Sequence, residues 1–128
     1  MDKRIVLTGA IFIFLGIILG AFAAHGLKNI VPEEKYIIIF EKGVRYQMYM
    51  GLGFLIVGFN ASKVALSLRL FYWFGLLGVI IFSGLLYLLS ITQIKVLGAI
   101  VPIGGTLMIL SWLLLIIKIW KQKSTKDS

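Results

Sequence analysis

The sequence predicts an all-α membrane protein with four transmembrane helices and an amphipathic interfacial helix between the first and the second. Of the 128 residues, 60% are hydrophobic and only 14% are charged, and the mean hydropathy is +1.03. Soluble domains carry roughly 25% charged residues, and a globule of this size has too little interior to bury so many apolar side chains. The apolar residues also form runs of about 20, the length that a helix needs to cross a bilayer.

Four apolar runs, separated by basic residues, define one domain over residues 1–120. The predicted spans are residues 5–24, 46–62, 70–90 and 96–117. Isolated strands cannot satisfy their backbone groups in lipid, so each run is predicted to be a helix. The polar, basic tail at residues 121–128 is predicted to be disordered.

The first span has a second interpretation. Lys3 and Arg4, an apolar run and the alanine-rich segment Ala21-Phe22-Ala23-Ala24 are also typical of a secretory signal peptide. The run is longer than the ~7–15 residues of a signal-peptide core, and Gly16 and Gly20 stand at helix-packing spacing. We therefore expect the first span to be retained.

The segment at residues 33–45 is amphipathic. Pro32 suits the first turn of a helix, and the apolar side chains that follow gather on one face. Glu41 and Arg45 lie on the polar side at a spacing of four residues, which favours an ion pair. This pattern predicts a helix lying in the membrane interface. One long tilted helix over residues 33–60 is the alternative that the sequence leaves open.

Lys and Arg residues predict the orientation and the partner. Four spans place both termini and the middle loop on one side, with eight basic residues against five on the other. Basic loops favour the cytoplasm, so cytoplasmic termini are expected. Because the charges that give the net +8 flank apolar runs, membrane lipids and not nucleic acid are the expected partner.

His25 ends the first span and precedes Gly26. An imidazole at the membrane surface can shuttle protons or bind a head group. The interpretation that we favour is structural: the side chain satisfies free carbonyls at the helix end, and Gly26 forms a left-handed cap.

Polar side chains at or inside the second and third spans are further candidates. They include Tyr46, Gln47, Ser83 and Tyr87. A polar group buried in a membrane bundle needs a partner, so we expect these residues to form hydrogen bonds between helices.

Pro102, Gly104 and Gly105 interrupt the fourth span. Proline removes a backbone hydrogen bond, and the glycines let the helix bend or another helix approach. A kink that shapes the bundle is expected. A broken helix that presents carbonyls to an ion or substrate is the alternative.

Reactive groups are scarce. The chain has no cysteine and one histidine, and no acidic residue lies within a predicted span. Proton-coupled exchangers usually need an embedded carboxylate, and nucleotide-binding or metalloprotease motifs are also missing. We therefore expect no cofactor, no metal and no enzymatic activity.

Five motifs occur in the order and spacing of a known family. They are Gly20-Ala21-Phe22-Ala23-Ala24-His25, Tyr46-Gln47, Phe82-Ser83-Gly84-Leu85-Leu86-Tyr87, Pro102-Ile103-Gly104-Gly105 and Trp112. From the first span to the fourth, the chain resembles the small membrane proteins of domain of unknown function 423, also called uncharacterised protein family 0382, which includes the transmembrane protein 256-like proteins. The resemblance implies a four-helix protein, commonly of the bacterial plasma membrane, without an established activity or catalytic residues.

Three positions depart from that family. Met50 stands where relatives often carry a histidine, Leu85 where they carry a serine, and Val101 where they carry a threonine. Each departure replaces a polar side chain with an apolar one, which favours a structural role for these positions.

The sequence thus predicts a non-enzymatic plasma-membrane protein of unknown molecular role that binds lipid, a second copy or another membrane protein. Residues 33–45 and the basic tail are the expected contact surfaces. A small oligomeric channel or transporter, with a path near His25, Gln47 and Pro102, is the alternative.

Overall fold

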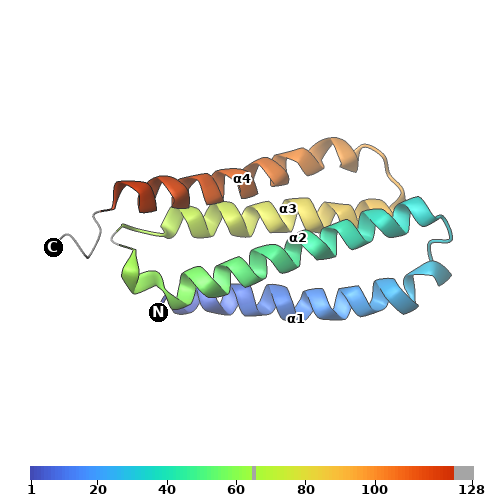
Figure 1. Cartoon of the computed structure of the whole chain (residues 1–128). Helices are drawn as coiled ribbons and strands as arrows, with labels where there is room; N and C mark the ends of the chain where they lie inside the picture. Colours follow the sequence, from blue (N-terminus) through green and yellow to red (C-terminus); the bar gives the residue numbers. More distant parts are fainter. Residues whose placement is uncertain (65, 123–128) are drawn as a thin grey trace.

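Four long helices run up and down in sequence order in the computed structural model, which describes residues 1–64 and 66–122 (Figure 1). The helices are α1 (Lys3–His25), α2 (Glu34–Phe59), α3 (Arg69–Thr92) and α4 (Leu97–Lys121). Short 3₁₀ turns at Leu27–Asn29 and Ala61–Lys63 lie in the α1–α2 and α2–α3 connections. No strand occurs within the described ranges, so the all-α prediction is confirmed.

Three of the helices can cross a membrane by length and composition: α1, α3 and α4, with 23, 24 and 25 residues. Each exceeds the ~20 residues that a span requires. Helix α2 is longer, at 26 residues, but its first half is rich in charged side chains, so it does not meet the same criterion.

Helix α2 is continuous from Glu34 to Phe59, so the separate interfacial helix predicted at residues 33–45 is wrong. The physical reason is that one face of α2 packs against the neighbouring helices along its whole length. Buried positions recur every three or four residues, from Tyr36 through Phe40 to Gln47 and beyond, so the same side of the helix faces its neighbours throughout. The long helix over residues 33–60 was the correct alternative.

The expected ion pair between Glu41 and Arg45 is also not formed. The salt bridge of the described chain joins Lys35 to Glu33, 3.8 Å apart at the start of α2. Both Glu41 and Arg45 are exposed. Two long side chains lose conformational entropy when they pair in solvent, and such pairs contribute little.

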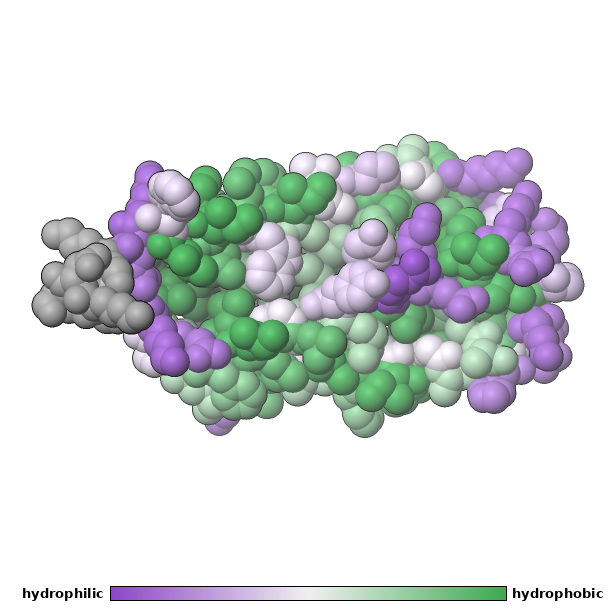
Figure 2. Space-filling model, viewed as in Figure 1, coloured by the Kyte–Doolittle hydropathy of each residue, from purple (hydrophilic) through white to green (hydrophobic). Residues whose placement is uncertain are grey.

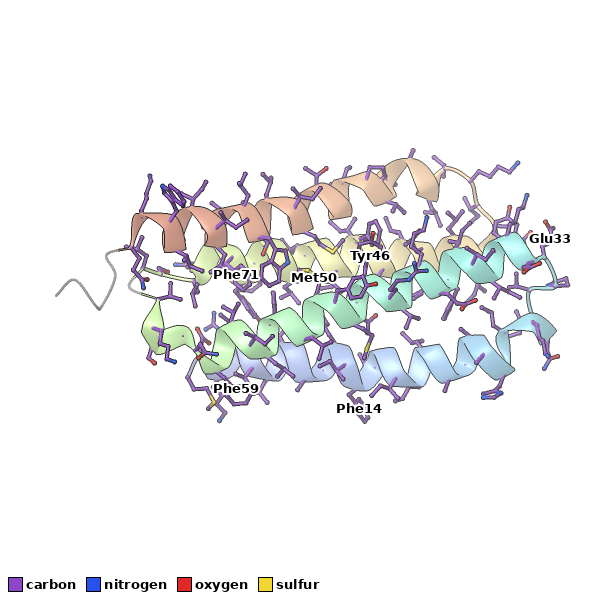
Figure 3. The ribbon with its side chains drawn as sticks, viewed as in Figure 1. Phe14, Glu33, Tyr46, Met50, Phe59 and Phe71 are labelled. Carbon is purple, nitrogen blue, oxygen red and sulfur yellow. The ribbon has the colours of Figure 1, made fainter. Side chains whose placement is uncertain are left out.

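The helices pack in a row. Helix α1 lies against α2, α2 against α3 and α3 against α4, so α1 and α4 hold the outer positions in Figure 1. One apolar cluster gathers around Phe54 and Phe71, and a second around Leu27 and Phe40. Outward-pointing side chains such as Phe14, 64% exposed, cover the outside (Figure 3).

Glycines allow the closest backbone contacts in the row. A Cβ atom on Gly9 would lie 2.8 Å from the carbonyl oxygen of Gly51, and one on Gly104 would lie 2.9 Å from that of Gly78 and against the Phe82 nitrogen. Close contact of this kind associates helices in lipid, where the hydrophobic effect does not.

Helix α4 contains Pro102 but continues without interruption to Lys121, so the broken-helix alternative does not hold. Pro102 lies near the helix start and is exposed. The predicted disordered tail is wrong at Lys121, which is helical, and Gln122 donates from Nε2 to the Lys63 carbonyl at 2.8 Å. Residues 123–128 lie outside the described residues.

Candidate functional site

Gln47 joins three helices at the centre of the row. Its Nε2 donates to the Phe12 carbonyl of α1 at 2.8 Å, and its Oε1 accepts a hydrogen bond from the Tyr87 hydroxyl of α3 at 2.6 Å. The side chain is 5% exposed. One residue of α2 therefore links both of its neighbours, as expected for a polar group inside a membrane bundle.

Three buried serines extend this pattern by donating to backbone carbonyls of the adjacent helix. The bonds are Ser83 to Gly43 (2.7 Å), Ser90 to Tyr36 (2.6 Å) and Ser111 to Phe71 (2.8 Å). Ser83 and Ser90 are two turns apart on α3, so both face α2. Ser111 was not among the predicted positions, although a serine inside an apolar run is itself the signal that identified Ser83.

The buried polar side chains are therefore hydrogen-bonded, mostly to backbone carbonyls of adjacent helices. Within the described ranges, every buried side-chain nitrogen or oxygen has a hydrogen-bond partner. Such bonds contribute roughly 0.6–1.7 kcal/mol each in membrane proteins. Chemically, this arrangement fixes the spacing and register of helices.

His25 stands apart from these bonds, exposed at the end of α1. Gly26 follows with φ −102° and donates to the Phe22 carbonyl at 2.8 Å, so the predicted left-handed cap is wrong. The reason is that the chain continues into the Leu27–Asn29 turn. The structure does not bring His25, Gln47 and Pro102 together, because they lie at the end of α1, inside the row and on the exposed side of α4.

Tyr46 and Gly105 line an apolar groove between α2 and α4, with Phe82 of α3 also in its lining. Its volume is about 650 Å³. The Tyr46 ring packs edge-on against Phe82, with centroids 5.1 Å apart, and Trp112 donates from Nε1 to the Met50 sulfur at 3.0 Å. Figure 3 shows Tyr46 and Met50 on the side of α2 that faces α3 and α4.

A second cavity, of about 990 Å³, lies where α1 and α3 begin. Its polar and aromatic lining consists of Asp2, Lys3, Arg4, Ser62, Ser67, Arg69, Tyr72 and Trp73. The Arg4 guanidinium carbon lies 5.7 Å from the centroid of the Tyr72 ring, and the Tyr72 hydroxyl hydrogen-bonds Thr8 at 2.9 Å. We call this space the basic cavity. Sequence reasoning counted these cations but could not place them around one space.

No three His, Cys, Asp or Glu side chains gather as metal ligands in the part of the chain that the structure describes. On the surface, Figure 2 shows an apolar band between two hydrophilic ends. A strip of more polar side chains crosses the band on this face.

Comparison with known proteins gives consistent similarities. A family model described as "Protein of unknown function (DUF423)" matches residues 19–105. The chain is 44% identical to a UPF0382 membrane protein of Staphylococcus haemolyticus over 119 residues, which are 93% of this chain and 97% of that one. It is 43% identical to the UPF0382 membrane protein YwdK of Bacillus subtilis over 117 residues, 90% of this chain and 94% of the relative. No solved structure matches the chain.

Proposed function

Because the chain belongs to the DUF423 (UPF0382) family of membrane proteins, we propose that it is a non-enzymatic, four-span protein of the plasma membrane that binds anionic phospholipids. It is an integral membrane protein, with three helices suited to span a bilayer. The fourth span, the plasma membrane, the orientation, the lipid partner and the non-enzymatic character are the proposed parts.

The path of the chain supports α2 as the fourth crossing. Helix α1 ends at one end of the bundle and α3 begins at the opposite end, so α2 runs the length of the bundle between them. Glu33 and Phe59 mark the two ends of α2 in Figure 3. At 1.5 Å per residue, Glu41 and Arg45 lie about 27 and 21 Å from Phe59. Both are exposed, and a long charged side chain can extend along apolar surface so that its charged group reaches the interface.

The distribution of charge carries the proposed lipid binding and the orientation. Among the described residues, the end where α1 begins carries six basic residues (Lys3, Arg4, Lys63, Arg69, Lys118, Lys121) and one acidic residue (Asp2). The opposite end carries five basic residues (Lys28, Lys35, Lys42, Arg45, Lys95) and three acidic residues (Glu33, Glu34, Glu41). Basic residues favour the cytoplasmic side and attract anionic lipid by ~1 kcal/mol each.

The engagement of buried polar groups supports a non-enzymatic role. Gln47, Ser83 and Tyr87 form hydrogen bonds between helices, which supports a structural role for these side chains. A channel assembled from several copies finds less support, because its proposed path residues, His25, Gln47 and Pro102, lie apart.

Native mass spectrometry tests the proposed lipid binding. The delipidated protein is given equal amounts of phosphatidylglycerol and phosphatidylcholine, which differ in net charge. We expect preferential retention of phosphatidylglycerol and a smaller preference at higher ionic strength, because salt screens charge attraction. Equal retention of both lipids would contradict the proposal.

A further inference from the structure

We propose that the basic cavity binds the phosphate group of an anionic phospholipid. This inference rests on the proposed lipid binding and names its site. The cavity has a volume of about 990 Å³ and lies where α1 and α3 begin, at the more basic end of the bundle.

Three cations from two helices line the basic cavity: Lys3 and Arg4 of α1 and Arg69 of α3. Its acidic lining residue, Asp2, accepts a hydrogen bond from the Ile5 backbone nitrogen at 3.2 Å. None of the three cations forms a salt bridge with a described residue. The cavity therefore holds excess positive charge that no carboxylate of the described chain neutralises by direct contact.

The cations suit a phosphate group. Guanidinium groups bind phosphate oxygens through paired hydrogen bonds, and lysine adds a point charge. Arg4 lies 5.7 Å from the Tyr72 ring centroid, within the range of a cation–π contact. That contact holds the guanidinium at the cavity wall, and Arg69 of α3 also lines the cavity.

The surroundings favour a lipid over free phosphate. Ile5 and Leu68 give the cavity an apolar part, and Trp73, 39% exposed, also lines it. Tryptophan at this level is typical of the membrane interface. One turn beyond Lys3, Leu7 is 50% exposed, and beside Arg69, Leu70 is 52% exposed. A lipid whose phosphate lies in the cavity can thus lay its acyl chains along α1 and α3.

Charge removal inside and outside the cavity tests the site. The double variant Arg4→Gln/Arg69→Gln is compared with Lys63→Gln/Lys121→Gln, which removes the same charge from the same end but not from the cavity lining. Phosphatidylglycerol is titrated against each full-length protein by native mass spectrometry. We expect a Kd about 25-fold higher for the cavity variant, at about fivefold per residue. The control should change by about twofold, because salt screens distant charges.

The outcomes separate the site from the proposed function. If the cavity variant binds phosphatidylglycerol as well as its control does, the site is wrong and general lipid binding stands. If the unaltered protein shows no preference for phosphatidylglycerol over phosphatidylcholine, both fail. If glycerol 3-phosphate binds the protein as tightly as phosphatidylglycerol does, the acyl chains contribute nothing to binding and the lipid assignment is wrong.

A charge-preserving variant covers the case in which the glutamine variant does not fold. Arg4→Lys/Arg69→Lys keeps both charges but cannot form paired guanidinium bonds. We expect a smaller loss of phosphatidylglycerol binding, of about threefold to tenfold. Unchanged binding would overturn the role of the two arginines. Far-UV circular dichroism checks that each variant keeps its helices.

Discussion

At the scale of single residues, side chains in the bundle bond mainly to the backbone of the next helix. Gln47 and Ser83 each donate to a carbonyl that also belongs to a helix ladder. Such a bond forms only when the two helices are aligned in one register, so each of these side chains stabilises that register.

Replacing Gln47 with leucine tests this role. The variant keeps a similar volume but removes the side-chain hydrogen bonds that Gln47 forms with the Phe12 carbonyl and the Tyr87 hydroxyl. We expect the free energy of unfolding to fall by about 1–2 kcal/mol. Unfolding in mixed detergent micelles, titrated with SDS and followed by circular dichroism, measures it.

Thr106→Ala is the matched control, because the exposed Thr106 hydroxyl bonds only the Pro102 carbonyl of its own helix, at 2.8 Å. Its effect should stay within about 0.5 kcal/mol. Equal losses in the two variants would remove the special role of Gln47.

The sequence predicted that Gln47, Ser83 and Tyr87 bridge helices, because a polar side chain within an apolar run needs a partner. It could not name the partners, since a backbone carbonyl has no sequence signature. The basic cavity was out of reach for a similar reason. Arg4 and Arg69 are 65 positions apart in sequence, and only the packing of α1 near α3 places them around one space.

At the scale of elements, close packing at glycines sets how near neighbouring helices lie. Gly104 faces the backbone of α3, whereas a Cβ atom on Gly84 would meet nothing within 4 Å. The two residues are both helical glycines in spans of similar composition, so they form a natural pair for comparison.

We predict opposite effects for alanine at these two positions. Gly104→Ala forces α3 and α4 apart and should lower the free energy of unfolding by about 1–3 kcal/mol. Gly84→Ala should be neutral or stabilising by up to about 1 kcal/mol, because alanine favours the helix. The SDS titration applies to both. A loss in Gly84→Ala as large as in Gly104→Ala would contradict the packing account.

The elements themselves were largely predictable, because long apolar runs bounded by Arg69, Lys95 and Lys118 leave little choice of structure. Helix α2 was the exception. Its charges at Glu41 and Arg45 suggested an interfacial segment, but the buried positions continue past them. The regular spacing of buried residues on one face of α2 keeps the helix continuous, although its other face carries charges.

At the scale of the whole molecule, the number of crossings decides where the loops lie. If α2 spans, the α1–α2 and α2–α3 connections lie on opposite sides of the membrane. If it does not, the two connections share a side. The absence of cysteine from the sequence makes this easy to measure.

Single cysteines at Asn29 and Ser62 report the two connections. In intact cells, a membrane-impermeant maleimide should label Asn29→Cys, whereas Ser62→Cys should react only after permeabilisation. The expectation follows from four spans with cytoplasmic termini. Labelling of both positions under the same condition would contradict a fourth crossing, and the reverse pattern would invert the orientation.

In the side-chain hydrogen bonds between α2 and α3, all the donors belong to one helix and all the acceptors to the other. Ser83, Ser90 and Tyr87 of α3 are the donors in these bonds, and the acceptors all belong to α2. A polypeptide cut in the α2–α3 loop would give two hairpins, one presenting hydroxyl groups and the other oxygen acceptors. Co-expressed, the halves should reassociate in the bilayer, and a tag on either one should recover its complement.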